Sequence, residues 1–210
     1  MGEFIGGCKI WRVCYDVFGG LTAKFCLLLF FMLGIKEKYN KEVVPNMKKK
    51  FGYKSVFAVP KITKVVVCTG IGKVVDEARK KAIEKSFTLI AGQKPKVNQA
   101  KKSIAGFKLR EGTPVGYSAT LRGQRMYDFL DKLINVAIPR IRDFRGLKLS
   151  AIDEANNFSI GFKEHIVFPE AIGEDTRSAF GLNVTIVTSA KTKEECADFL
   201  KLIGFPFSKK

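Results

Sequence analysis

The chain has 210 residues, 46% of them hydrophobic, which is enough for one domain with a substantial core. Lys and Arg number 37 against 20 Asp and Glu, and the net charge of +17 favours a polyanionic partner, nucleic acid before an anionic membrane surface. The five cysteines show no C-x-x-C spacing, which excludes a zinc ribbon or a redox pair and favours a reducing compartment.

The first 34 residues differ from the rest of the chain. They hold the only tryptophan, Trp11, three of the five cysteines and the apolar run from Phe25 to Leu33. This run is too short for a membrane span, which needs about 20 residues, and matches a signal-peptide core in length, although no A-x-A-like site follows it. We expect Met32 to be the true start. Residues 1–31 are then an N-terminal extension, upstream sequence or disordered, and residues 32–210 form a single domain.

The pattern that follows predicts a helix and then a strand. Apolar residues recur every four positions from Ile35 to Phe51, so we expect an amphipathic helix that Pro45 kinks or restarts and Gly52 ends. The β-branched run within 61–72 predicts a strand. Its G-I-G ending lacks the third glycine of a dinucleotide-binding fingerprint, because residue 75 is valine, and therefore favours a tight turn.

A strongly basic stretch, residues 94–125, follows a second helix that Asp76 can cap and Gly92 can end. It holds eight Lys or Arg and one acid, Glu111. Glycine and proline interrupt it and apolar residues are sparse, which predicts a basic loop flanked by strands, the second at 117–121. A solvated charged face is the simpler interpretation. The small residues between the cations favour a surface that a phosphate backbone approaches closely.

A third helix is predicted for 124–138, with Pro139 at its end. The segment 139–147 alternates arginines with apolar residues and is expected to be extended. Because alternate side chains of an extended segment point to opposite sides, Ile141 would be a buried anchor and the arginines an outer basic edge.

Two further strands, 158–168 and 182–189, and a last helix complete the chain. Thr192 to Glu195 is a capping box that begins this helix. Its inner face is expected to hold Cys196, Phe199, Leu200 and Ile203. The order of elements predicts an α+β fold, an antiparallel sheet with helices packed on one face and a long basic loop, which leaves the other sheet face free to meet RNA.

No constellation for catalysis or metal binding is present in the sequence. His165 is the only histidine, and no HExxH, G-x-S-x-G or metal-ligand cluster accompanies it. We therefore expect no enzyme, no cofactor and no metal. Two alternatives remain at this stage: a basic membrane-surface protein anchored by residues 25–33, and an RNA-modifying enzyme, which would need the missing constellation.

Four blocks stand out, namely GQKPKVNQAKKSIAGFKLREG (92–112), TLRGQRMYDFLDKLINVAIPRIRDFRGL (120–147), NFSIGFKEHIVFPE (157–170) and GFPFSKK (204–210). In sequence and order they resemble bacterial large-subunit ribosomal protein number five, the 5S ribosomal RNA carrier. The resemblance covers about Leu33 to Lys210. It implies a cytoplasmic, ribosomal location, a single ribosomal RNA-binding domain over 32–210, and a structural role in the large subunit.

The resemblance also implies partners and sites. The partners would be 5S rRNA, large-subunit rRNA, peptidyl-site tRNA, small-subunit protein thirteen and other 5S rRNA-binding ribosomal proteins, with no membrane; the protein would help to attach 5S rRNA in the central protuberance. The 5S rRNA surface would include Thr69, Gly70, Gly72, Gln93, Lys94, Thr120 and Arg122. The tRNA-contacting loop would include Gln99, Lys101, Lys102, Ser103, Gly106 and Lys108. The inter-subunit bridge would include Arg142, Asp143, Arg145, Asp153 and Asn157.

Two departures from the family pattern stand in these regions. Many members have Asn where this chain has Cys68, and a thiol is a weak hydrogen-bond donor, so an amide contact to RNA would be lost. Many also have D-G-R-G-N at the turn that reads Asp153 to Asn157 here. This turn has lost two glycines and an arginine, which affects the expected bridge.

Overall fold

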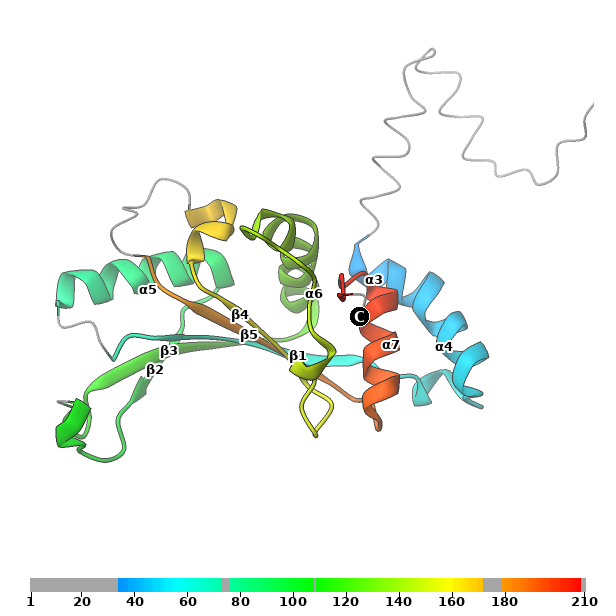
Figure 1. Ribbon diagram of the computed structural model, residues 1–210, viewed down its shortest axis with the longest axis horizontal. Helices are drawn as coiled ribbons and strands as arrows, with labels where there is room; N and C mark the ends of the chain where they lie inside the picture. The colour runs from blue at the N-terminus through cyan, green and yellow to red at the C-terminus, as the bar shows by residue number, and fades with distance from the viewer. Residues whose placement is uncertain (1–33, 73–75, 108, 172–178, 209–210) are drawn as a thin grey trace, which may run out of the picture.

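A computed structural model of the chain describes residues 34–72, 76–107, 109–171 and 179–208 (Figure 1). The expectations for residues 1–33 and for Lys108 lie outside this part. Its strands form one five-stranded antiparallel sheet in the order β2-β3-β1-β5-β4, which confirms the predicted α+β class. The strands are β1 Ile62–Gly70, β2 Lys96–Gln99, β3 Pro114–Leu121, β4 Phe158–Phe162 and β5 Leu182–Thr188.

The helices fall into two groups (Figure 1). Over one face of the sheet lie α5 Glu77–Ala91, α6 Gly123–Lys132 with its π-helical continuation η4 Leu133–Ala137, and the 3-10 turns η7 His165–Val167 and η8 Pro169–Ala171. Beyond one end of the sheet lie α3 Ile35–Lys38, η1 Tyr39–Val43, α4 Val44–Phe51 and α7 Lys193–Ile203. Short 3-10 turns in the connections are η2 Val56–Ala58, η3 Ala105–Phe107, η5 Ile138–Arg140 and η6 Leu149–Ala151.

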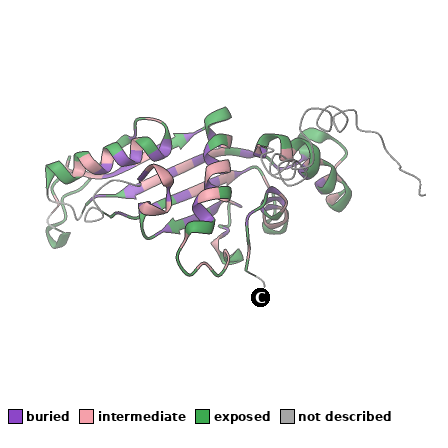
Figure 2. Cartoon of the chain, turned by 90° about the horizontal axis from the view of Figure 1, so that it is seen from above, coloured by how far each residue is buried: buried purple, intermediate pink, exposed green. Residues whose placement is uncertain are grey.

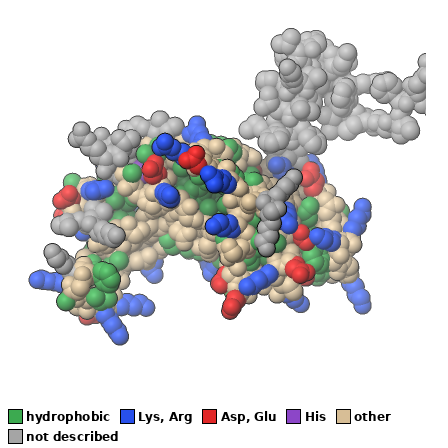
Figure 3. Space-filling view, in the orientation of Figure 1, with side chains coloured by type: hydrophobic (Ala, Val, Ile, Leu, Met, Phe, Trp, Pro, Cys, Tyr) green, Lys and Arg blue, Asp and Glu red, His purple; other side chains and the backbone are tan. Residues whose placement is uncertain are grey.

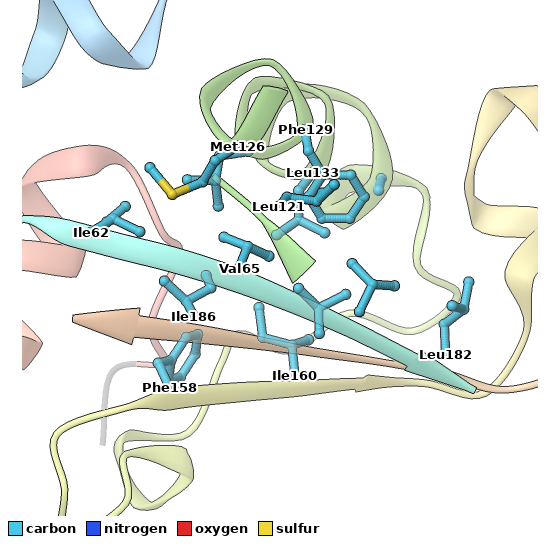
Figure 4. Close-up of a cluster of buried hydrophobic side chains, with 14 of the residues drawn as sticks. Ile62, Val65, Leu121, Met126, Phe129, Leu133, Phe158, Ile160, Leu182 and Ile186 are labelled. Atoms are coloured by element: carbon cyan, nitrogen blue, oxygen red, sulfur yellow. The ribbon is translucent and has the colours of Figure 1, made fainter. Parts of the chain in front are cut away.

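The core lies between the sheet and the helices of the first group. Strand register aligns buried side chains across the sheet, as in the row Leu121, Val65, Ile186 and Phe158. Met126, Phe129 and Leu133 of α6 and η4 meet this face (Figure 4). Figure 2 shows buried residues along the strands and on the helix sides that meet them. Burial on one face only is the reason for the period-two pattern of each strand.

The predicted N-terminal helix is continuous from 35 to 51 but contains a π-helical turn, η1, directly before Pro45. Proline has no N–H and its ring collides with the carbonyl one turn earlier, and widening that turn relieves the collision. The backbone N–H of Ile35 donates to both carboxylate oxygens of Asp131, at 3.1 and 3.2 Å. A side chain of α6 therefore caps this helix, and burial is the main cause that raises the pKa of Asp131.

Two local expectations need correction. The strand predicted for 158–168 ends at Phe162, because the backbone N–H of His165 bonds to the carbonyl of Phe180 and the chain turns into η7. The segment 139–147 is not extended: Pro139 begins a 3-10 turn, and Asp143 takes a left-handed conformation. Ile141 and Phe144 still pack against the core, with exposed arginines between and beside them.

Helix caps were predicted with mixed success. Thr192 and Glu195 form the complete capping box of α7, as expected, and the four expected inner residues of α7 are buried. Asp76 occupies the N-cap position of α5, but its side chain accepts no capping hydrogen bond, so its expected role is only positional. Gly52 and Gly92 end α4 and α5 as predicted.

The buried His165 makes stability depend on pH. Its ring stacks on Phe180 at 4.1 Å, its Nδ1 accepts a hydrogen bond from the Phe180 backbone N–H at 3.4 Å, and burial lowers its pKa. The unfolded chain binds a proton here below about pH 6.5, whereas the folded protein resists it. The contribution of neutral His165 is therefore present above the unfolded pKa and is lost as the pH falls toward the folded pKa.

We predict that the free energy of unfolding falls more steeply between pH 7.5 and 5.5 in the natural protein than in His165→Gln. The difference in slope is at most about 1.4 kcal/mol per pH unit, because one proton is involved. Urea unfolding at the two pH values measures it. Since the chain has one histidine, parallel slopes in the two proteins would contradict the assignment.

Candidate nucleic-acid interface

The sheet face opposite the helices is lined by small polar side chains. We call it the open face, and strand register defines it. One row across it contains Thr120, Val66, Thr185 and Ser159, and the next contains Lys96, Ser118, Cys68, Asn183 and Gly161. These residues are exposed or partly exposed. None of the five described strands contains an acidic residue, so a phosphate backbone meets no carboxylate on them.

Side chains of the open face bond to one another across strands. The Ser118 hydroxyl donates to Oδ1 of Asn98 at 3.2 Å, and the hydroxyls of Ser159 and Thr185 lie 3.1 Å apart. Such pairs hold donors and acceptors in place on a rigid sheet. An A-form RNA minor groove presents 2′-hydroxyls and base edges, which groups of this kind contact by hydrogen bonds.

A shallow depression lies at one end of the open face. Cys68, Asn98 and Asn183 line it together with Gly70, Gly116 and Gly181. Gly116 faces Gly70 across the β1–β3 pair, and a Cβ at Gly116 would lie 2.7 Å from the carbonyl oxygen of Thr69, so only glycine fits there. The missing side chains let a ligand approach the backbone closely.

The residues expected to contact 5S rRNA fall at two ends of this face. Gly70 and Gly72 are exposed beside the depression. The side chain of Thr69 points the other way: it is buried, and its hydroxyl donates to the Gly181 carbonyl at 2.8 Å. Thr69 therefore fixes the backbone beneath the site and offers no side chain to a ligand on the open face.

The second group lies near the other end of β3. Nε2 of Gln93 donates to the Thr120 carbonyl at 3.3 Å, which brings the end of α5 onto β3. Lys94 and Arg122 are exposed on either side of this contact. Thr120 is four residues along β3 from Gly116, or about 13 Å at 3.3 Å per residue. The two groups thus bracket the middle of the open face instead of forming one cluster.

Sequence reasoning missed the residues between the two groups. They are Lys96, Asn98, Ser118, Ser159, Asn183 and Thr185. Their signal was available in the alternation of polar with buried residues, as in Asn183 and Thr185 of the last strand. What the sequence could not supply was the pairing of strands, which puts the alternate positions of distant segments on one surface.

The basic loop is a hairpin extension of β2 and β3, residues 100–113. Backbone hydrogen bonds join Ala100 to Thr113 and Gly112, and Ile104 to Leu109, while the Ser103 hydroxyl accepts from the Glu111 N–H at 3.0 Å. Lys101 and Lys102 are exposed, as are Gln99, Ser103 and Gly106. Figure 3 shows cations projecting from this tip, at the end of the molecule away from α4 and α7.

The expected bridge residues lie on two separate turns. Arg142, Asp143 and Arg145 are exposed on the turn after η5, which the C-terminal tail holds through the parallel pairing of Leu147 with Phe207. Asp153 and Asn157 close the other turn, with the Asp153 N–H donating to the Asn157 carbonyl at 2.8 Å.

The altered 153–157 turn keeps its shape through Asn156. This residue stands at the second glycine of the family pattern and has a φ of 59°, a conformation that asparagine tolerates better than other side chains. Its Nδ2 donates to the Ala190 carbonyl at 3.2 Å, and its own carbonyl accepts from the Thr188 hydroxyl at 2.6 Å. The turn therefore survives the loss of glycine, while the arginine is replaced by the exposed Ala155.

The structure contains no other candidate chemistry in its described part. No group of three His, Cys, Asp or Glu residues there could hold a metal ion. No described helix is both long and apolar enough to cross a membrane, and the 25–33 run lies outside the described residues. Burial raises the pKa of the Cys68 thiol, the opposite of what a reactive nucleophile requires.

Comparison with known proteins agrees with the fold and the basic surfaces. Residues 55–110 match the family described as ribosomal protein L5, and residues 114–207 match the family described as the C-terminus of the same ribosomal proteins. The chain is 51% identical over 178 residues to the large ribosomal subunit protein uL5 of Desulforapulum autotrophicum, covering 84% of this chain and 99% of the relative. It is 50% identical over 177 residues to the protein of the same name in Brevibacillus brevis, covering 83% and 98%.

Cys68, in the middle of the open face, is a built-in probe of RNA binding. With 5S rRNA at ten times its Kd, we predict that alkylation of Cys68 by N-ethylmaleimide slows about ten-fold, because only the free protein reacts. Peptide mass spectrometry resolves it from the other cysteines. Cys196, buried under α7, should stay unreactive throughout. An unchanged rate at Cys68 would place the RNA elsewhere.

Proposed function

The chain belongs to the ribosomal protein L5 family and is a structural constituent of the large ribosomal subunit, and from this premise we propose that its open face binds 5S rRNA. The observation that carries the proposal is a sheet face with fixed hydroxyl and amide groups, free of carboxylates on its strands and bracketed by Lys94 and Arg122. Hydroxyls and amides suit 2′-hydroxyls and base edges, and the two cations suit phosphates.

The two-part layout suits a duplex RNA better than a single exposed base. Gly70 and Gly72 offer backbone at one end, and Gln93, Thr120 and Arg122 offer side chains at the other, about 13 Å away. A ligand that touches both ends must be rigid over that span, as a helical RNA is. By holding 5S rRNA in this way the protein would help to attach it in the central protuberance, beside large-subunit rRNA and other proteins that bind 5S rRNA.

The 100–113 hairpin is the part we assign to peptidyl-site tRNA. Its tip stands clear of the sheet and the helices (Figure 1), and in the described part of the chain Lys101 and Lys102 form no ion pair. These lysines are therefore available to a phosphate backbone without breaking an internal contact. A projecting basic tip suits a ligand that arrives and leaves while the open face keeps its permanent partner.

The two turns at 142–147 and 153–157 are the surface that we assign to small-subunit protein thirteen. Both are exposed and both are anchored from behind, one by the C-terminal tail and one by Asn156. A bridge between subunits needs such rigidly supported turns. The lost arginine at Ala155 would leave Arg142 and Arg145 as the main cations of this contact.

The rival functions have no support from the relatives. Both named relatives are ribosomal proteins, so an RNA-modifying activity has no precedent among them. A membrane-surface role would depend on residues 25–33, which precede the stretch matched by the family, residues 55–207.

The 5S rRNA proposal is tested by salt dependence. Each phosphate contact contributes about −0.9 to the slope of log K against log salt for a duplex, so Arg122→Ala should flatten the slope by about one unit. Filter binding of 5S rRNA over a range of KCl concentrations measures the slope. Arg142→Ala, an equally exposed arginine outside the open face, is the matched control and should leave it unchanged. Equal slopes for both variants and the natural protein would remove Arg122 from the interface.

Charge reversal separates the two RNA partners. Lys101→Glu with Lys102→Glu turns two attractions to phosphate into repulsions, so we predict weaker retention of peptidyl-site tRNA on assembled ribosomes with nearly intact 5S rRNA binding. Lys81→Glu with Lys85→Glu, on the exposed side of α5, is the control pair and should affect neither. Both bindings are measured at matched salt. Loss of 5S rRNA binding with normal tRNA retention would refute the assignment of the hairpin.

A further inference from the structure

Phe57 is the most exposed large apolar side chain in the described part of the chain. Its relative exposure is 98%, against 73% for Phe107 on the basic hairpin, and its neighbour Val56 is 51% exposed. A phenylalanine held in water gains a large amount of buried area when a partner covers it, so a free ring of this kind indicates a contact surface. Neither the open face nor the hairpin accounts for it, because η2 lies beneath α4 at the opposite end of the molecule (Figure 1).

The turn that carries Phe57 is fixed at both ends. The Ser55 hydroxyl accepts from the Phe57 N–H at 3.3 Å, and the Val59 N–H donates to the Val56 carbonyl at 3.2 Å. Val59 and Pro60 are buried, and Lys61 is tied to Ser189 through both its N–H and its carbonyl. The ring is therefore presented on a rigid turn, so that a partner that covers it has little backbone entropy to overcome.

The charge around Phe57 decides what kind of partner fits. From residue 43 to residue 72 the chain has six lysines and no acid. Lys54 and Lys61, on either side of the turn, are exposed and form no ion pair within the described residues. An aromatic ring between unpaired cations suits a nucleic acid, in which a base stacks on the ring and the adjacent phosphates meet the lysines. A protein partner would favour a wider apolar patch than one ring and one valine.

We propose that Phe57 stacks on an unpaired base of ribosomal RNA, with Lys54 and Lys61 on the neighbouring phosphates. The inference rests on the proposed function, since it requires the protein to be bound to RNA. It adds a second RNA contact at the far end of the molecule from the hairpin. The base belongs either to 5S rRNA or to large-subunit rRNA, and the ring would recognise it in the same way in both.

The test uses the full-length protein with Phe57→Ser, Phe57→Leu and Phe57→Trp, and with Leu89→Ser as the control. Leu89 is 56% exposed on α5 and has no assigned partner. One arm measures binding to isolated 5S rRNA. The other rebuilds large subunits from parts lacking the natural protein and maps 2′-hydroxyl acylation of both RNAs. Loss of a stacked base should weaken binding roughly 5- to 150-fold in the arm that supplies the base.

The expected pattern has three further parts. Phe57→Trp binds like the natural protein, Phe57→Leu falls clearly below it, and the salt slope stays unchanged because no phosphate contact is removed. One nucleotide becomes reactive toward acylation in Phe57→Ser and stays protected in Leu89→Ser. A change confined to the rebuilt subunits identifies large-subunit rRNA as the source of the base.

Two results would overturn the inference. The first is unchanged binding and unchanged acylation in Phe57→Ser in both arms. The second is an effect in subunits that Phe57→Leu fully restores without any change in acylation, which would assign the ring to a protein partner. Failure of the proposed function looks different, because the natural protein itself would then not bind 5S rRNA. Thermal unfolding of each variant checks the fold, which an exposed ring should not affect.

Discussion

The structure depends on a sheet that is covered on one side only. β1 lies at its centre, paired with β3 on one edge and β5 on the other, and Val65 and Val67 of this strand are fully buried. Each such side chain contributes roughly 1.5–3 kcal/mol through its removal from water. Because successive residues of a strand face opposite ways, stability and recognition occupy alternate positions of the same segment. Val65 and Val67 hold the fold, while Val66 and Cys68 between them face the ligand.

Charge imposes a second constraint on this arrangement. The described ion pairs number four, and they involve the N-terminal helices, α7 and the Lys132–Glu170 contact, none of them on the open face. The cations that we direct toward RNA therefore enter no ion pair in the part that the structure describes, and with a net charge of +17 they repel one another in the free protein. Bound RNA removes that repulsion. The natural state of this chain is the complex, and its isolated form carries an electrostatic cost that salt partly screens.

The sequence allowed most of the elements to be predicted, but not how they combine. The valine run of β1, the capping box of α7 and the helix after Arg122 were all legible because each depends on local spacing alone. The strand at 158–168 was overextended because its end is set by a bond between His165 and Phe180, fifteen residues apart. The open face required the register of four strand pairs, which no local pattern encodes.

Exposure was the other quantity that sequence could not give. Phe57 lies in a stretch of mixed apolar residues and looks like any core phenylalanine until the turn around it is seen. Asn156 looked like the loss of a glycine, although its left-handed backbone and buried amide keep the same turn. The roles of individual residues came from the family resemblance, and the structure adds which of them have side chains free to act.

The C-terminal tail places the end of the chain under a surface formed much earlier in the sequence. Leu147 pairs in parallel with Phe207, and its carbonyl accepts from the Ser208 N–H at 2.9 Å. During synthesis the turn at 142–147 emerges long before the residues that hold it. That turn therefore takes its final form only after release of the completed chain. A truncated product lacks this support, so the surface directed at the other subunit reports that translation of the protein itself reached its end.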